Sequence, residues 1–590
     1  MRPSVWAPDR RRVRAVVDGT VAELQPDPQR PGWWLLAEDL APGSRYGFLL
    51  DDSEHPLPDP RSERLPDGVH GLSQVYDGSA YRWRDREWAG RKLAGAVIYE
   101  LHIGTFTLGG TLDSAIERLD HLVELGITHI ELLPVNAVNG VWNWGYDGVA
   151  WYAVHEPYGG PDALKRFVDA AHQRGLAVLL DVVYNHLGAS GNYLPEFGPY
   201  LKDGRNTWGD LVNLDGEGSA EVRRFILDNA LRWLADFHLD GLRLDAVHAL
   251  HDESPTHLLR QLADEVHELS GRIGRPLPLI AESDLNDARL ITPAGQQFAG
   301  RDGYGLDAQW DDDVHHVLHA MLSGERHGYY ADFGDLPSLA KVFTKAFFHD
   351  GTYSSFRQRN HGYPVDTART PGWRFVVFLQ DHDQIGNRAA GDRLPEVVSP
   401  GLLRVGAALL LTSPFTPMLF MGEEWAAGTP WPFFTSHPEP ELGTAVSEGR
   451  LAEFSDHGWD SSQMVDPQSP AAYQQAVLNW AEPLQPAHRR MLQLYRELIR
   501  LRAAEPALAD ADLRQVRVDY DESGHWLVVH RGPFRVLANL SGEPHRFPIL
   551  GSVVLATEPV EAGAGTVGAG DPEGSGIELP AQSAAIVRVS

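Results

Sequence analysis

The stretch DGLRLDAVH at residues 240–248 decides the fold of this chain, because it is a short apolar run that ends in charged residues. Leu242 and Leu244 are typical of a buried strand, and Asp245 stands where that strand should end. Three further runs end in the same way: DVVYNH at 181–186, AESD at 281–284 and DHDQ at 381–384. In a barrel of parallel strands, side chains at the carboxyl ends of the strands form the active face.

A single charged residue at a strand end also fits a structural ion pair. For Asp181 alone this interpretation is favoured, because an isolated buried carboxylate is costly and Arg243 on the neighbouring strand can pair with it. Four strand ends of this kind are much harder to explain by packing. The pattern therefore predicts that these side chains converge on one mouth.

Outward from these runs, strand and helix patterns alternate. Counting the strand candidates, which include 96–101, 129–135, 176–183, one near Leu306-Asp307 and one at 418–421, gives about eight. This number indicates a closed (β/α)₈ barrel, the TIM barrel, over residues 86–505, although periodicity alone also fits an open doubly wound sheet. Helices are expected at 114–125, after Pro161, and at 491–501 to close the barrel. The stretches 186–208 and 310–374 are expected to be loop insertions over the mouth.

The two ends of the chain have short strand-like runs between turns. Residues 1–85 indicate an immunoglobulin-like β-sandwich of the carbohydrate-module kind, with strands at 13–17, 33–36 and 46–50. The Pro-rich stretch 55–60 is typical of a linker. Residues 506–590 indicate a C-terminal antiparallel β-sandwich, with a mobile Gly-rich turn at 562–576.

Composition excludes several classes of protein and site. The net charge of −30 argues against nucleic-acid or anionic-membrane binding, which need basic surfaces, but the charge also fits simple solubility. The absence of cysteine excludes disulfides and thiolate chemistry. No apolar run has the length of a signal peptide or a membrane span, so we expect a cytoplasmic protein, either a monomer or a weak homodimer.

Converging carboxylates suit glycoside hydrolysis with retention. One carboxylate attacks the anomeric carbon, and a second, protonated one donates to the leaving oxygen at a separation of about 5 to 5.5 Å. A neighbouring negative charge keeps the acid protonated. The chain has neither a nucleotide-binding loop nor a GxSxG elbow that would indicate another chemistry.

The segments DVVYNH, GLRLDAVH, IAES and FLQDHD resemble, in order and spacing, the four signature regions of the α-amylase superfamily. The resemblance implies that Asp245 is the nucleophile, Glu282 the acid/base and Asp383 the stabiliser of the transition state. It also implies that Arg243 orients the nucleophile and that sugar hydroxyls are bound. The residues expected to contact substrate in this way are His186, His248, His382, Gln384 and Asn387. Asp381 replaces the usual Asn, a departure that leaves the following His-Asp pair intact.

Trp144 and Tyr146 belong to WGYD at 144–147, where superfamily members hold an aromatic platform. Lone aromatic residues more often pack inside a protein. At a barrel mouth their faces suit the apolar face of a pyranose, so we expect both to contact the sugar.

Segments outside the four regions indicate which group of the superfamily the chain resembles. Five such segments are similar to those of maltooligosyltrehalose trehalohydrolases: PDGVHG at 66–71, YELHIGTF at 99–106, DQIGNR at 383–388, FMGEEW at 420–425 and VSEGR at 446–450. This resemblance implies hydrolysis of the α-1,4 bond next to a terminal trehalose, with maltooligosyltrehalose and related α-glucans as partners. Glycogen branching and debranching enzymes are the alternatives, although branching enzymes usually have a second Glu where Ser283 stands. A non-catalytic α-glucan-binding protein is the alternative of a different class.

The run Trp310 to His316 contains three aspartates and two histidines. Adjacent histidines do not point the same way, and no metal-ligand spacing such as HExxH is present. We therefore expect substrate contacts from Asp312, Asp313, His315 and His316 rather than a metal site. Asn185 stands where some superfamily amylases hold calcium, but without an acidic ligand set, so no metal and no cofactor are predicted.

Overall fold

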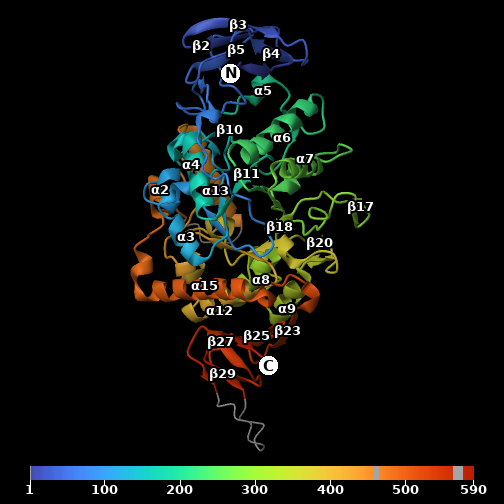
Figure 1. The fold of residues 1–590 in the computed structure, drawn as a ribbon, viewed down its shortest axis with the longest axis vertical. Coiled ribbons are helices and arrows are strands. Elements are labelled where there is room, and N and C mark those ends of the chain that lie inside the picture. The colour runs from blue at the N-terminus through green and yellow to red at the C-terminus, as the bar shows by residue number, and fades with distance from the viewer. Residues whose placement is uncertain (1, 457–463, 563–575, 590) are drawn as a thin grey trace, which may run out of the picture.

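The computed structural model describes residues 2–456, 464–562 and 576–589. Figure 1 shows three parts along the long axis: an N-terminal sheet, a central barrel with its helices, and a C-terminal pair of sheets. The barrel is formed by parallel strands in which each strand pairs with the next along the chain, and the last strand pairs with the first. The eight strands are β7 (Ile98–Leu101), β8 (His129–Leu132), β11 (Ala177–Val182), β14 (Gly241–Leu244), β15 (Leu279–Ala281), β18 (Ala308–Trp310), β21 (Phe375–Val377) and β22 (Thr416–Phe420). The predicted closed barrel is confirmed, and the open sheet is excluded.

The sixth strand lies later than predicted. β18 begins at Ala308, whereas the prediction placed a strand end near Leu306-Asp307. The Asp307 carboxylate instead accepts a hydrogen bond from the Leu279 amide at 2.9 Å, at the amino end of the neighbouring strand β15. A strand of three residues has too little periodicity to be located from the sequence.

Helix α4 (Gly160–Gln173) shows how the sequence forms the outer layer. Pro161 occupies its first turn, Leu164, Phe167 and Val168 are fully buried, and Gly175 with φ +77° follows its end. The predicted helix at 114–125 is divided into α2 and α3. The longer helices are α2 (Leu112–Ile116), α3 (Leu119–Leu125), α6 (Ser219–Asp236), α7 (Leu258–Ile273), α8 (Asp312–Ser323), α9 (Leu336–Lys345), α12 (Pro400–Thr412), α13 (Pro440–Asp456) and α15 (Pro486–Ala504).

The shorter helices connect these elements. They are α1 (Ile103–Phe106), α5 (Leu194–Phe197), α10 (His382–Gly386), α11 (Leu394–Val397), α14 (Pro470–Gln475) and α16 (Pro506–Ala509). Small antiparallel pairs lie outside the barrel: β9 (Asn136–Ala137) with β10 (Ala150–Val154), β12 (Leu201–Arg205) with β13 (Asp210–Val212), β16 (Gln297–Phe298) with β17 (Arg301–Asp302), and β19 (Thr352–Ser354) with β20 (Arg359–His361). The predicted insertion at 186–208 thus contains α5 and strand β12. The stretch 310–374 is not a loop insertion, since it contains α8 and α9.

The N-terminal strands form a six-stranded antiparallel arrangement that fits a sandwich. Its order is β1 (Ser4–Trp6), β4 (Trp33–Leu36), β3 (Thr20–Pro26), β2 (Val13–Val17), β5 (Arg45–Leu50) and β6 (Ser73–Gln74). The Pro-rich stretch is not a free linker. Leu57 pairs with Phe48, and the buried Asp59 accepts a hydrogen bond from Tyr46 at 2.8 Å. This stretch therefore packs against the sheet that it follows.

The C-terminal strands form two antiparallel sheets. One has the order β23 (Arg517–Asp521), β24 (Trp526–Arg531), β25 (Phe534–Asn539), β30 (Ser583–Arg588) and β27 (Ser552–Ala556), and the other β26 (His545–Phe547), β29 (Ile577–Leu579) and β28 (Glu561–Ala562). Leu537 and Val587 of the first sheet share a buried cluster with Phe547 and Leu579 of the second, as a sandwich requires. The Gly-rich turn predicted at 562–576 falls almost wholly on 563–575, outside the described residues.

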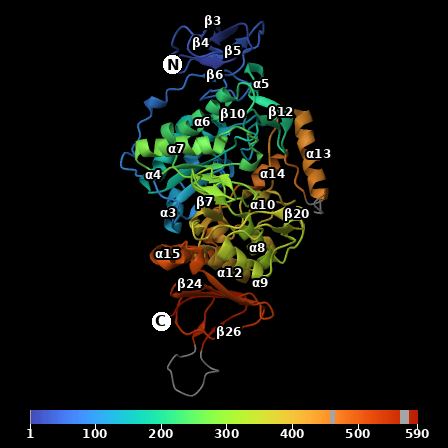
Figure 2. The ribbon, with the colours of Figure 1, turned by 90° about the vertical axis from the view of Figure 1, so that its right-hand side faces the viewer.

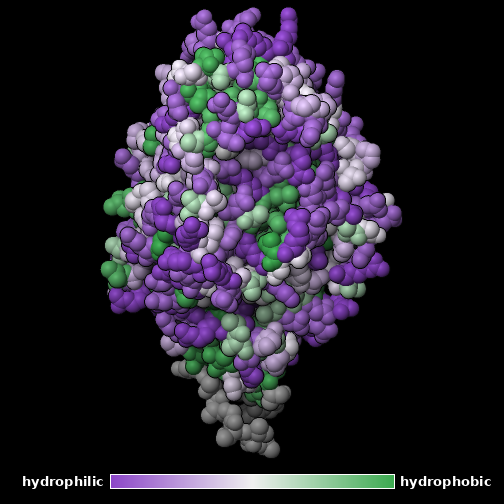
Figure 3. All heavy atoms as spheres, turned by 45° about the horizontal axis from the view of Figure 1, so that its top comes forward, coloured by the Kyte–Doolittle hydropathy of each residue, from purple (hydrophilic) through white to green (hydrophobic). Residues whose placement is uncertain are grey.

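Figure 2 shows α15 and α12 lying between the barrel and the C-terminal sheets. The surface seen in Figure 3 is largely hydrophilic, and hydrophobic residues gather there in small groups. Across the described ranges, no helix combines the length and the apolar character needed to cross a membrane.

Candidate active site

Asp245 and Glu282 follow neighbouring barrel strands at the same level. Leu244 of β14 pairs with Ala281 of β15, so the next residue of each strand is one of the two carboxylates. The backbone continues the pairing for one more residue, because the Asp245 amide donates to the Val182 carbonyl at 3.1 Å and the Glu282 amide donates to the Leu244 carbonyl at 2.9 Å. Both side chains therefore start from rigid backbone at the carboxyl end of the barrel.

The Arg243 guanidinium lies between these carboxylates and has no exposed surface. Its Nη1 donates to Asp245 Oδ1 at 2.7 Å and to both Asp181 oxygens at 2.9 Å. Its Nη2 lies 3.7 Å from Glu282 Oε2. The Asp245 and Glu282 side chains are 12% and 15% exposed, so the arginine is sealed while the two carboxylates can be reached.

Asp245 is held from a second side. The Asn185 amide nitrogen donates to Asp245 Oδ2 at 2.8 Å and to the Asp245 carbonyl at 3.0 Å. Donors on both carboxylate oxygens fix the orientation of the Asp245 side chain, as a nucleophile needs.

Glu282 is placed differently. Its Oε2 accepts a hydrogen bond from the Ala246 amide at 2.5 Å, and Ala246 has a left-handed backbone with φ +40°. Burial, together with the Asp245 charge, raises the pKa of Glu282 well above its usual value, against the opposing effect of Arg243. The raised pKa keeps a proton on Glu282 near neutral pH, as a general acid requires.

Asp383 lies in the first turn of α10 after β21, a strand that only β18 separates from β15 in the barrel. The Asp381 carboxylate caps this helix by accepting the amides of Asp383 at 2.9 Å and Gln384 at 3.0 Å. The residue that departs from the superfamily pattern therefore has a local structural function. The Asp383 side chain is 45% exposed and faces solvent at the mouth.

His382 and Tyr146 connect the start of α10 to Asp181 and Arg243. His382 Nε2 lies 2.7 Å from the Tyr146 hydroxyl, which donates to Asp181 Oδ2 at 2.6 Å, and the two rings stack. Burial lowers the pKa of His382, but the carboxylates of Glu100 and Asp383 outweigh it and raise this pKa to about 10. The imidazole is therefore a cation at neutral pH.

The loop that holds Tyr146 needs a glycine beside it. Gly145 has φ +112°, and a Cβ there would lie 2.4 Å from the Pro134 carbonyl oxygen. Trp144 points inward: it is 4% exposed, stacks on Trp431 and contacts the His382 ring edge. The structure thus places Tyr146 at the mouth and Trp144 in the packing beneath it, which corrects the expectation that both face the sugar.

His186 and His248 lie at the rim on either side of an exposed tryptophan. His186 Nε2 contacts the Tyr146 carbonyl at 3.0 Å, and its ring stacks on Trp208, whose edge approaches His248. Trp208 is 48% exposed. It follows β12, in a stretch that was predicted only as an insertion.

The four predicted substrate contacts after β18 point in different directions, because α8 begins at Asp312. Asp312 and His316 are partly exposed, and burial with nearby Asp381 and Asp284 raises the pKa of Asp312 well above its usual value. Asp313 is buried and accepts the amides of Phe348 and His349 at 2.8 Å. His315 is fully buried, 2.8 Å from the Leu379 carbonyl and 2.9 Å from the Tyr330 hydroxyl. The expectation of direct substrate contact is therefore corrected for Asp313 and His315, whose side chains are satisfied inside the protein.

Comparison with known proteins agrees with this geometry. Residues 74–208 match the family model "Alpha amylase, catalytic domain", and residues 511–586 match "Domain of unknown function (DUF3459)". The malto-oligosyltrehalose trehalohydrolase of Arthrobacter ramosus is 56% identical over 99% of this chain and 99% of its own length. The one of Mycobacterium tuberculosis (strain ATCC 25618 / H37Rv) is 51% identical, again over 99% of both chains. The chain belongs to the malto-oligosyltrehalose trehalohydrolases.

A solved structure, described as a putative alpha amylase from Salmonella typhimurium, matches with a TM-score of 0.88 and 35% identity, covering 100% of this chain and 97% of that one. The (β/α)₈ barrel of this malto-oligosyltrehalose trehalohydrolase family member, and the sheets at both of its ends, are thus shared with a known structure.

In this family member, α13 carries the VSEGR motif and lies beside the mouth. Arg450 Nη2 donates to Asn387 Oδ1 at 2.5 Å and to the Gly386 carbonyl at 3.1 Å, so Asn387 is tied to α13. Gln384 is partly exposed near the start of α10. Neither contact to substrate is tested, and both stay predictions.

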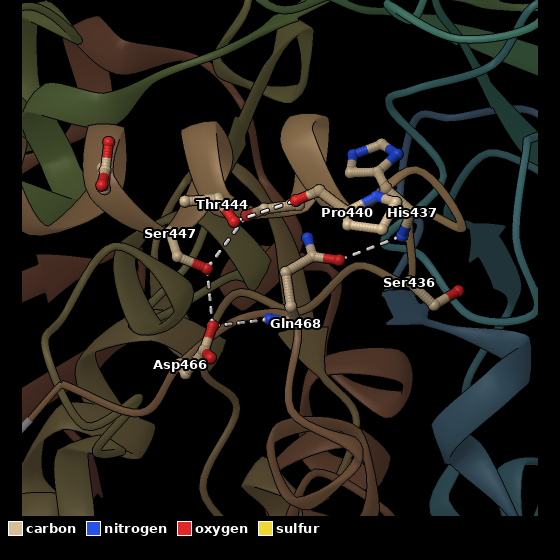
Figure 4. Close-up of a pocket in the computed structure, with 9 residues that line it drawn as sticks. Ser436, His437, Pro440, Thr444, Ser447, Asp466 and Gln468 are labelled. Carbon is tan, nitrogen blue, oxygen red and sulfur yellow. Dashed lines mark hydrogen bonds between the residues drawn. The ribbon is translucent and has the colours of Figure 1, made fainter.

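A pocket of about 480 Å³ lies between α13 and the segment around Gln468 (Figure 4). Gln468 accepts the His437 amide at 3.0 Å, and Ser447 donates to Asp466 at 2.7 Å. The His437 ring lies 3.9 Å from Asp147, the residue after Tyr146. The pocket therefore adjoins the loop that carries Tyr146.

Sequence reasoning missed Glu100, which contacts His382, and Trp208. Glu100 stands in the predicted strand of YELHIGTF, where a charge inside an apolar run was the available signal. No group of three or more His, Cys, Asp or Glu within the described ranges is arranged to hold a metal ion, and the Asn185 amide is directed at Asp245.

Proposed function

We propose that this chain hydrolyses the α-1,4-glucosidic bond next to the terminal trehalose of maltooligosyltrehalose, with Asp245 as nucleophile, Glu282 as acid/base and Asp383 as stabiliser. The observation that carries the chemistry is the pair of carboxylates at neighbouring strand ends on one buried guanidinium. The substrate follows from the names of the full-length relatives.

In the first step, the Glu282 carboxyl gives its proton to the glycosidic oxygen while Asp245 attacks the anomeric carbon. The bond to the leaving trehalose breaks, and a glycosyl ester forms on Asp245. In the second step, the Glu282 carboxylate takes a proton from water, and the resulting hydroxide equivalent displaces Asp245. The products are trehalose and a maltooligosaccharide with retained configuration.

The electrostatics support this division of roles. Arg243 and Asn185 donate to Asp245 and hold it in place, while burial favours the neutral form of Glu282. Once Asp245 is esterified its negative charge is gone, so the pKa of Glu282 falls and the residue can act as a base. Asp383, which follows β21 at the mouth, can face the positive charge that develops on the sugar ring.

The test is an assay that offers maltooligosyltrehalose beside a plain maltooligosaccharide of equal length. We expect trehalose from the first substrate and much slower cleavage of the second, measured by chromatography of the released sugars. Predominant glucose or maltose would indicate a general amylase, and new α-1,6 bonds would indicate a branching enzyme. Binding without any product would support the non-catalytic alternative.

Three further predictions are separate from the chemistry. A cytoplasmic location, the absence of nucleic-acid binding and a monomer or weak homodimer remain predictions from the sequence. Sedimentation velocity over a range of protein concentrations would test the oligomeric state, because a weak dimer dissociates on dilution.

A further inference from the structure

A continuous series of hydrogen bonds crosses the barrel interior from β7 to the end of β14. Glu100 Oε1 lies 2.5 Å from His382 Nδ1, and His382 Nε2 lies 2.7 Å from the Tyr146 hydroxyl. Tyr146 donates to Asp181 at 2.6 Å, and Asp181 and Asp245 accept from the same nitrogen of Arg243. Glu100, which is 1% exposed, begins this series.

Glu100 contacts His382 twice. Besides the ring contact, Glu100 Oε2 accepts the His382 backbone amide at 3.1 Å. One carboxylate therefore fixes both the imidazole and the first residue of α10, and the next residue of α10 is Asp383.

The protonation of His382 decides the direction of the Tyr146 hydrogen bond. With Nδ1–H donated to Glu100, a protonated Nε2–H must donate to the Tyr146 oxygen, which leaves the hydroxyl proton for Asp181. If Nε2 lost its proton, it would become an acceptor and would compete with Asp181 for that proton. Asp181 would then lose a donor, and its contact with Arg243 would change.

We propose that Glu100 is a positioning residue for the hydrolysis: it keeps His382 a donor to Tyr146, and through Tyr146, Asp181 and Arg243 it fixes the orientation of Asp245. This inference rests on the proposed function, because Asp245 is the nucleophile only within it. It assigns a role to the Glu of YELHIGTF, a residue that touches neither the sugar nor the reacting atoms.

Other titratable groups also lie near His382. They are Asp381 at the N-cap of α10, Asp383 on α10, Glu131 on β8, Asp181 on β11 and His102 after β7. Of these, Asp383 and Asp381 also favour the cation. Glu100 alone among these acids has a hydrogen bond to the ring nitrogen Nδ1.

The decisive variant is Glu100→Gln, and Glu131→Gln is its matched control. Glu131 is the register partner of Glu100 on the adjacent strand and is equally buried at 1% exposure, but it has no hydrogen bond to His382. Both substitutions remove one buried carboxyl and keep its shape. The measurements are kcat and KM with maltooligosyltrehalose from about pH 5 to about pH 9, expressed per folded molecule from circular dichroism.

We expect Glu100→Gln to lower kcat at alkaline pH by about 10- to 100-fold, as loss of an outer-shell partner does elsewhere, with little change in KM. Without Glu100, burial meets less opposition, so His382 loses its proton at lower pH. The deficit should therefore shrink as the pH falls and His382 is protonated again. Glu131→Gln should keep a constant ratio to the wild type at every pH.

A deficit of Glu100→Gln that is equal at all pH values, or a wild-type rate, would overturn the inference. A second measurement covers a variant that folds poorly: adding Glu100→Gln to His382→Gln should cost no further activity, and additive losses would contradict a role through His382. If the wild-type chain releases no trehalose, the proposed function fails. If it does and the pH pattern is absent, only the role of Glu100 fails.

Discussion

The two ends of strand β14 hold two charge clusters that are built for opposite purposes. At the amino end, Asp240 accepts from His172 at 2.8 Å, from the Val178 amide at 2.8 Å and from Trp88 at 2.7 Å. At the carboxyl end, Asp245 shares Arg243 with Asp181. One strand of four residues thus separates a structural cluster from the proposed catalytic one.

The clusters differ in what they leave unpaired. His172 has both ring nitrogens bound, to Asp85 and Asp240, and Trp88 stacks on its face. Arg243, by contrast, has Nε and Nη2 without a hydrogen-bond partner in the described part of the chain, although it is fully buried. A buried nitrogen without a hydrogen-bond partner is costly, so a cluster that only stabilises the fold pairs its polar groups. A functional site can retain unpaired polar groups because its chemistry uses them.

The largest expected effect comes from Asp245→Asn. An amide cannot form the glycosyl ester, so we expect kcat to fall at least about 10⁴-fold, roughly 5.5 kcal/mol in activation free energy. The melting temperature should stay within about 3 °C of the wild type, because the shape is kept. A variant that retains most of the wild-type kcat would refute the assignment of Asp245.

Glu282→Gln should have the next largest effect, a fall in kcat of about 10²- to 10⁴-fold. In the wild type, activity requires the Glu282 proton and is lost as the pH rises through the raised pKa of this residue. The variant has no such proton, so the basic limb of its pH–rate profile should disappear. Persistence of the same basic limb in the variant would show that another group sets it.

Asp240→Asn makes the same aspartate-to-asparagine change as Asp245→Asn, but at the amino end of β14. We expect loss of about 3 kcal/mol in unfolding free energy, because His172 and Arg275 lose a buried anionic partner. Its kcat per folded molecule should stay close to wild type, measured after chemical denaturation has fixed the folded fraction. A large fall in kcat with unchanged stability would mean that the two ends are not functionally separate.

The smallest effect concerns the pH dependence of the amino-end cluster. Burial lowers the pKa of His172, but hydrogen bonds and charges from Asp240 and Asp85 outweigh burial and raise this pKa. Burial raises the pKa of Asp85, but the hydrogen bonds from His172 and His238 outweigh burial and lower this pKa. The His172 contribution is therefore complete below the unfolded value of about 6.5 and is lost as the pH rises through the higher folded pKa. The Asp85 contribution is present above the unfolded value of about 3.9 and is lost as the pH falls through the lower folded pKa.

Asp85→Asn should consequently destabilise the fold by about 1–2 kcal/mol near pH 5 to 6 and by less at alkaline pH. Thermal melting of both proteins across this range measures the difference. An equal difference at all pH values would indicate that His172 is not charged in the folded state.

The sequence predicted the positions of Asp245 and Glu282 because each directly follows a buried strand. Apolar runs such as LRL and LIA locate the strand, and the carboxyl end of a parallel strand has only one place in a barrel. The sandwiches were predicted for the same reason, from short apolar runs between turns. The sequence also predicted the pairing of Asp181 with Arg243, which the structure contains at 2.9 Å.

Other features depend on contacts that no local pattern records. Successive residues of α8 point about 100° apart, so Asp312 and His316 are partly exposed while Asp313 and His315 are buried. Position after a strand was too coarse a guide for these four. Glu100 contacts His382, which lies 282 residues later in the chain. Trp144 lies beneath Tyr146 because Trp431 and Phe434 pack on it.

The barrel closes between its first and last strands, since β22 pairs with β7 through Met418 and Ile98. The reacting groups come from β14, β15 and the turn after β21, all synthesised before that seam can form. A nascent chain on the ribosome therefore contains every proposed catalytic carboxylate well before its barrel can be shut. Onset of activity during translation should mark emergence of the stretch after residue 420, and a chain released earlier should be an open, inactive sheet.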